Sequence, residues 1–286
     1  KYCARGKKCN GTVCRYSGSG AAGKIKKKFK KKNLQIRTYV CIMIAYRDRS
    51  GGRTGLKVNF YAIMPMKNKK IRRLLNMLDN IELLCHSSIR INKEKIIYID
   101  PYKIEKKYND ADLIFITHDH YDHYSEEDID KVKKEDTVII APEELLTKLL
   151  RKGFRQDHII TVEPNKEYIT EGIKFETVPA YNTNKQFHPK ENEWVGYIIE
   201  IKGIRYYIAG DTDITEENKK VKCDVAFVPV GGTYTMDFKE AAYLINEIKP
   251  KIAIPTHYGS VVGAEQDAVN FVRLLHPITK GIILMK

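Results

Sequence analysis

The chain has 286 residues, enough for one large domain or two small ones, and its 43% hydrophobic content is ordinary for a globular protein. Its nearest approach to a membrane span, YVCIMIAY at 39–46, is far shorter than the ~20 apolar residues required. The sequence has no signal-peptide pattern, and its six cysteines are scattered without close pairs. We therefore expect a cytoplasmic protein with no cysteine-based zinc site.

The formal net charge of +14 is concentrated near the start of the sequence. Up to Met77 there are 22 lysines and arginines against one acidic residue, Asp48, whereas the remainder has 28 basic and 35 acidic residues. We expect residues 1–65 to be a basic, disordered segment that precedes a hydrolase domain over 66–286. Such a segment is a solvated tail, an arm that contacts nucleic acid, or a stretch foreign to the native protein, which would then start at Met64 or Met66.

From residue 80 onward, short β-rich runs alternate with helical patterns. Strands are expected at 95–99, 112–116, 137–140, 158–162, 173–178, 194–201, 204–209, 225–230, 252–255 and 282–285. Helices are expected at 126–134, 142–151, 237–248 and 264–275. The first helix follows Ser125, with Asp128 placed three residues on as in a capping box. Many strands with few helices predict an α/β fold in which two sheets pack together and the helices lie outside.

Histidines and aspartates follow three of these strands, where sites are usually built. They are His118, His120, Asp122 and His123 after 112–116, Asp211 after 204–209, and His257 after 252–255. Imidazole and carboxylate without thiolate suit zinc, iron or manganese. The alternate positions 118 and 120 point the same way in an extended loop and can hold one metal ion. Asp122 and His123, after the chain turns into the next helix, can reach a second.

The motifs HDHYDH, GDTD (210–213) and PTHYGS (255–260) resemble those of the metallo-β-lactamase superfamily, over residues 78–286. The stretches CHSSIRI (85–91) and YIDPY (98–102) are similar to early strands of that family. PVGGTYTMD (229–237) resembles the branch of small metal-dependent hydrolases related to ascorbate-phosphate lactonase. The resemblance implies a four-layer αββα sandwich with a two-metal site along one sheet edge.

The same resemblance implies a role for each motif residue. His118 and His120 would bind the first ion, Asp122, His123 and His257 the second, and Asp211 would bridge them. The two divalent ions, zinc in the first instance and manganese or iron as alternatives, would hold a hydroxide that cleaves an ester, lactone or phosphodiester of a small molecule. Asp122 and Asp211 would be the catalytic carboxylates.

One further ligand of the first ion is expected on the loop ahead of Asp211. His188 is our prediction for it, while Asn182 in its place, or a weak first site, are the alternatives. His86, in CHSSIRI, is interpreted as a buried packing or supporting residue beside the site.

Two main alternatives and a minor one remain open from the sequence. A nuclease of the same fold would agree with the basic N-terminal segment, but residues 78–286 have a net acidic composition and no added domain separates Asp211 from His257. A non-catalytic metal-binding module would agree with the uncertain ligand between residues 180 and 190. A diiron oxygen-reducing enzyme is a minor option, because that branch typically has glutamate where His120 stands.

Overall fold

The computed structural model describes residue 74 and residues 76–284. The expected basic segment, residues 1–65, and the last position of the expected strand at 282–285 lie outside these residues.

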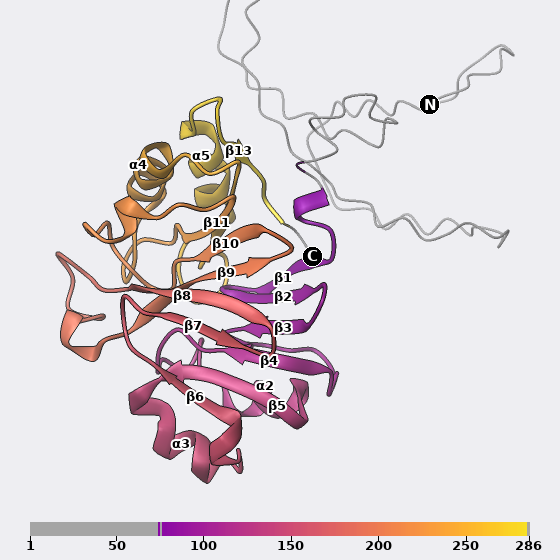
Figure 1. Ribbon diagram of the computed structural model, residues 1–286. Helices are drawn as coiled ribbons and strands as arrows, with labels where there is room; N and C mark the ends of the chain where they lie inside the picture. Colours follow the sequence, from indigo (N-terminus) through magenta and orange to yellow (C-terminus); the bar gives the residue numbers. More distant parts are fainter. Residues whose placement is uncertain (1–73, 75, 285–286) are drawn as a thin grey trace, which may run out of the picture.

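Within this part of the chain, the strands form two mixed sheets (Figure 1). The first has the order β1 (Ile81–Cys85), β2 (Ser88–Asn92), β3 (Ile96–Ile99), β4 (Ala111–Phe115), β5 (Lys133–Pro142) and β6 (Ile159–Val162). The second has the order β13 (Lys280–Gly281), β12 (Ile252–Thr256), β11 (Val225–Pro229), β10 (Ile204–Ile208), β9 (Val195–Ile201), β8 (Ile173–Pro179) and β7 (Glu167–Thr170). In both sheets an antiparallel meander passes into parallel strands, from β3 onward and from β10 onward.

The helices lie on the outer faces of the two sheets. They are α2 (Glu126–Val132), α3 (Leu146–Arg151), α4 (Phe238–Ile248) and α5 (Glu265–Leu274), with short 3-10 turns at Glu143–Leu145, Gln156–His158, Lys190–Asn192 and Asn218–Lys220. Figure 1 shows α4 and α5 on one side of the molecule and α2 and α3 on the other, with the strands between. None of the helices in the described range is long and apolar enough to cross a membrane.

Strand residues alternate between a central core and two outer cores. In β4, Leu113 and Phe115 join the core between the sheets, while Ile114 packs toward α2 and α3. In β10, Tyr206 faces the central core and Tyr207 faces α4. Strands buried on both faces read as near-continuous apolar runs, which is why the sequence revealed them. The predicted αββα sandwich is confirmed.

The boundaries differ from expectation where local patterns were weak. The sequence did not predict β1 or β7, and β2 was recognised only through the CHSSIRI motif. The last strand was expected at the apolar run 282–285. In the structure it is the two-residue β13, which precedes that run. The first helix ends at Val132, and β5 begins immediately at Lys133, because Lys133 already has an extended backbone.

Asp128 departs from the expected capping box. Ser125 does cap α2 by accepting the Asp128 N–H at 3.3 Å, but the Asp128 carboxylate does not return to the Ser125 backbone. It accepts the backbone N–H groups of Lys103 and Ile104 at 2.8 and 2.9 Å instead, and so fastens the loop after β3 to α2. A complete capping box is present at α4, between Asp237 and Glu240.

Asp128→Asn should lower the free energy of unfolding by about 1.5–3 kcal/mol at pH 7, because two backbone N–H groups, of which that of Ile104 is buried, lose a charged acceptor. Burial raises the pKa of Asp128, but bonds from Lys131, Ser125 and the backbone outweigh it and hold the pKa below the ordinary 3.8. The carboxylate therefore contributes stability above about pH 4 that is lost as the pH falls through its folded-state pKa. Urea unfolding at several pH values tests this.

The matched control for this measurement is Asp136→Asn, since the Asp136 side chain is 76% exposed. We expect its free energy of unfolding to stay within about 0.5 kcal/mol of wild type. A stability difference between wild type and Asp128→Asn that persisted unchanged into acid would contradict the assigned role of the carboxylate.

Candidate metal centre

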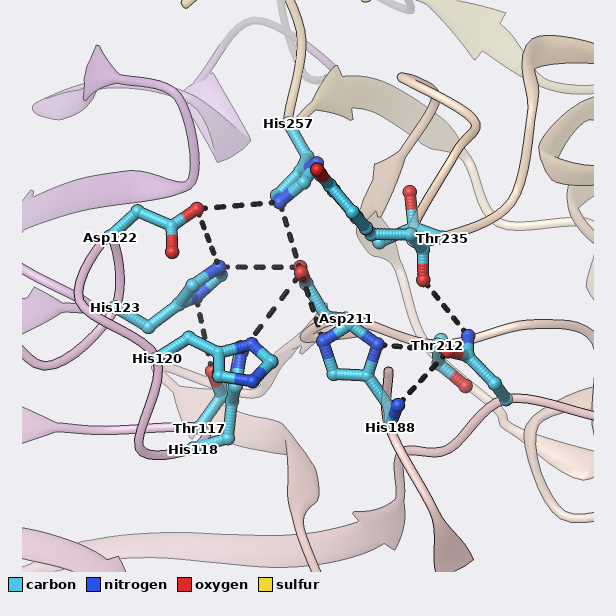
Figure 2. A network of polar contacts seen from close by, with 12 residues as sticks. Thr117, His118, His120, Asp122, His123, His188, Asp211, Thr212, Thr235 and His257 are labelled. Atoms are coloured by element: carbon cyan, nitrogen blue, oxygen red, sulfur yellow. Dashed lines mark hydrogen bonds and ion pairs between the residues drawn. The ribbon is translucent and has the colours of Figure 1, made fainter. Parts of the chain in front are cut away.

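The expected site residues converge at one edge of the sandwich, from both sheets. The HDHYDH loop follows β4, Asp211 follows β10, and His257 follows β12. Figure 2 shows Asp211 in the middle of the surrounding rings, with dashed contacts converging on it. Parallel strands place their carboxyl ends at the same edge, so residues almost 140 positions apart in sequence meet there.

The first group of donors is His118, His120 and His188, whose ring nitrogens lie within 4.8 Å of one another. His118 Nε2 is 3.1 Å from His120 Nδ1. Trp194, which is 6% exposed, packs against all three rings with centroid distances of 4.9–5.5 Å. Burial, together with the neighbouring imidazoles, lowers the pKa of His118 and of His120. Both rings are therefore neutral near pH 7, as a metal ligand must be.

Asn182 holds His188 in place. The Asn182 amide donates to the Tyr234 carbonyl at 2.9 Å, which directs its Oδ1 toward His188. That oxygen accepts from the His188 backbone N–H at 3.1 Å and lies 3.0 Å from His188 Nδ1. The proton of the ring is thereby placed on Nδ1, and Nε2 keeps its lone pair facing Asp211. Of the two residues proposed from the sequence, His188 is the one that the structure places with His118 and His120.

The second group of donors is Asp122, His123, His257 and, unexpectedly, His86. Asp122 Oδ2 lies 3.8 Å from His123 Nε2, 3.7 Å from His257 Nε2 and 3.2 Å from His86 Nε2. All four side chains are buried, Asp122 being the most accessible at 8%.

Asp211 lies between the two groups. One carboxylate oxygen is 2.9 Å from His257 Nε2, 3.4 Å from His188 Nε2 and 4.0 Å from His118 Nε2. The other is 3.3 Å from His123 Nε2. Burial raises the pKa of Asp211, but the charges of His257 and His123 outweigh it and hold the pKa well below its ordinary value. The carboxylate therefore stays ionised at the centre of the site.

Asp100 and Thr117 orient two of the imidazoles from behind. The buried Asp100 carboxylate accepts from His123 Nδ1 at 2.7 Å and from the Thr117 hydroxyl at 2.7 Å. Since that hydroxyl donates to Asp100, it is left to accept from His118 Nδ1 at 2.9 Å. Both rings thus point Nε2 into the site, in the carboxylate–histidine arrangement typical of metal ligands. The sequence showed Asp100 only as part of YIDPY; its place directly after a buried strand was the available signal.

Unpartnered polar atoms mark this as a cation site. Among the described residues, eight buried side-chain nitrogens and oxygens have no hydrogen-bond partner, and seven belong to His86, His123, His188, Asp211 and His257. Each buried polar atom without a partner lowers the free energy of unfolding by about 1–3 kcal/mol. Nitrogen lone pairs and carboxylate oxygens that face one another in this way fit divalent cations, so the donor set matches the group that the motifs imply.

Asp119, which alternates with the ligands in sequence, has a different role. Its carboxylate forms an ion pair with Lys148. The remaining histidines, His158 and His276, lie at a 3-10 turn and beyond the end of α5, away from the site.

Comparisons with known proteins agree with this geometry. Residues 80–257 match the family model of the beta-lactamase superfamily domain. A UPF0173 metal-dependent hydrolase of Thermococcus onnurineus is 29% identical over 217 residues, which cover 71% of this chain and 95% of the relative. Another, of Lysinibacillus sphaericus, is 30% identical over 206 residues, covering 66% of this chain and 89% of the relative.

Solved structures of metal-dependent hydrolases are also similar to this chain. A crystal structure described as a metal-dependent hydrolase of Parabacteroides distasonis is 32% identical, with a TM-score of 0.61, and the match covers 71% of this chain and 91% of that one. A metallo hydrolase of Ignicoccus hospitalis, 23% identical with a TM-score of 0.59, supports the fold. The chain therefore belongs to the metallo-β-lactamase superfamily, and its relatives there are metal-dependent hydrolases.

Proposed function

We propose that this protein is a dinuclear metal-dependent hydrolase. The observation that supports it is a pair of donor groups on either side of Asp211, which together with Asp211 contain nearly all the buried unpartnered polar atoms of the described residues. The first ion would be held by His118, His120 and His188, the second by Asp122, His123 and His257, with Asp211 between them. Zinc suits these imidazole and carboxylate donors, and manganese or iron are the alternatives.

When bound, two such ions lower the pKa of a water toward about 7 and polarise the substrate oxygen. The protein's own groups do the positioning. Asp122 and Asp211 remain carboxylates, because nearby imidazoles hold both pKa values below the ordinary range despite burial. Asp211 Oδ1, which has no hydrogen-bond partner among the described residues, faces His123 Nε2 at 3.3 Å and would be available to an ion held between them. We assign both as the catalytic carboxylates.

A small molecule with an ester, lactone or phosphodiester bond is the proposed substrate. The acidic balance of residues 78–286 is unfavourable for polyanions such as RNA. We propose that the hydrolase domain spans 66–286 and that any nucleic-acid contact belongs to residues 1–65. Salt-dependent RNA binding that survived removal of residues 1–65 would instead favour the nuclease alternative.

His118→Ala and Asp211→Asn should each lower the initial rate on the best wild-type substrate by about 100-fold or more, since each removes a charge-stabilising element of the site. The measurement is a panel of lactones, phosphodiesters and thioesters, with the full chain loaded with zinc or manganese. Asp119→Asn is the matched control, because Asp119 lies in the same loop but pairs with Lys148. Variants as fast as wild type would overturn the site assignment.

A second set of variants tests which residue completes the first metal site. His188→Ala should abolish tight binding of one metal equivalent. Asn182→Ala should weaken it about 10- to 100-fold, by releasing the ring. Asn182→Asp keeps an acceptor for His188 Nδ1 but loses the donor to the Tyr234 carbonyl, so it should weaken binding less than Asn182→Ala does. Calorimetric titration gives the affinities; a full loss in Asn182→Ala with little effect in His188→Ala would make Asn182 the ligand.

A further inference from the structure

His86 occupies a position in the backbone that disfavours histidine. Cys85 pairs with Ser88, so His86 and Ser87 form the two-residue turn between β1 and β2. His86 has φ +55°, a conformation that hairpin turns usually fill with glycine, asparagine or aspartate. Non-glycine residues held at positive φ cluster at functional sites, where the surrounding structure compensates the strain.

The turn is fastened to the site by its backbone. The His86 carbonyl accepts the N–H of His257 at 3.1 Å, and His257 also has a positive φ, of +56°. The two rings lie 3.8 Å apart between centroids. His86 is therefore held against a proposed metal ligand both by the main chain and by ring contact.

The Asp122 carboxylate is the one acidic side chain that His86 approaches closely among the described residues. Its side chain is fully buried, yet neither Nδ1 nor Nε2 has a hydrogen-bond partner among the described residues. Nε2 lies 3.2 Å from Asp122 Oδ2, but the pair does not meet the geometry of a hydrogen bond, and this contact leaves Nδ1 without a partner as well. An apolar side chain would fill the space without burying two unpartnered nitrogens.

We propose that His86 Nε2 is an additional donor to the second metal ion, beside Asp122, His123 and His257. This inference rests on the proposed two-metal function. With Asp211, the second ion would have up to five protein donors, whereas the first would have four. The second ion would then be the more firmly retained of the two, and open positions for water and substrate would lie mainly at the first, as in catalytic sites that keep a position free.

His86→Gly tests this without endangering the fold, because glycine is the residue best suited to φ +55°. We expect it to weaken binding of one Co²⁺ equivalent by about 10-fold or more. The visible d–d absorption of the Co²⁺-loaded protein should change in intensity as the coordination number falls. His158 lies away from the site, so His158→Ala is the control: its Co²⁺ affinity and spectrum should equal those of wild type.

Small molecules that refill the space left by the ring separate ligation from packing. Free imidazole should restore the affinity and the Co²⁺ spectrum of His86→Gly, because it has a lone pair for the ion. Pyrrole, of nearly the same shape, donates an N–H but has no such lone pair and should restore neither. Equal rescue by pyrrole, or a His86→Gly protein with unchanged affinity and spectrum, would overturn the inference.

The outcomes also separate this inference from the proposed function. If wild type binds two ions and hydrolyses the panel while His86→Gly is unchanged, only the inference about His86 fails. If wild type binds two ions and His86→Gly shows the expected losses but nothing on the panel is hydrolysed, the hydrolase proposal fails and the inference stands. If wild type binds no Co²⁺, both fail.

Discussion

The structure of the site depends on one constraint, which is that Asp211 is buried, ionised and faced by four imidazoles. A carboxylate there is costly unless positive charge compensates it. In the protein alone that charge comes from protons, since the pKa values of His123 and His257 are raised by Asp211 and other carboxylates in spite of burial. Divalent cations would supply the same charge while satisfying the nitrogen lone pairs. Metal binding should thus displace protons, and the two ions and Asp211 should act as one unit.

The sandwich provides the rigid frame that this arrangement requires. Each ligand-bearing loop leaves a strand whose side chains pack in the central core on one face and under helices on the other. Close approaches of backbone fix the loops further. A Cβ on Gly231 would lie 2.2 Å from the His257 carbonyl oxygen, and one on Gly210, which has φ +66°, would lie 3.2 Å from the Val195 carbonyl. Both positions need glycine for the strand ends to meet.

Much of this could be predicted from the sequence, for identifiable physical reasons. Strands buried on both faces form apolar runs, and the polar residues that terminate them stand out, so His118, Asp211 and His257 were placed correctly at strand ends. The resemblance to the superfamily supplied the sandwich. Amphipathic or short strands such as β7 (Glu167–Thr170) carry no such signal, because alternate residues face solvent.

Other features depend on contacts between segments that local patterns do not encode. The choice between His188 and Asn182 rests on the Asn182 amide bonding to the Tyr234 carbonyl, 52 residues away in sequence. The roles of Asp100 and His86 follow from the packing of β3 and of the β1–β2 turn against the HDHYDH loop. The Asp128 carboxylate was assigned to a local cap but serves a loop 24 residues earlier. In each case a long-range partner competes successfully with the local one.

The most direct test of this account is an anomalous-diffraction map, at the zinc edge, of crystals of the full chain loaded with zinc. We expect two peaks on either side of Asp211, about 3.5–4 Å apart, one beside His118, His120 and His188 and the other beside Asp122, His123 and His257. A single peak, no peak, or a pair that does not share Asp211 would contradict the two-metal site.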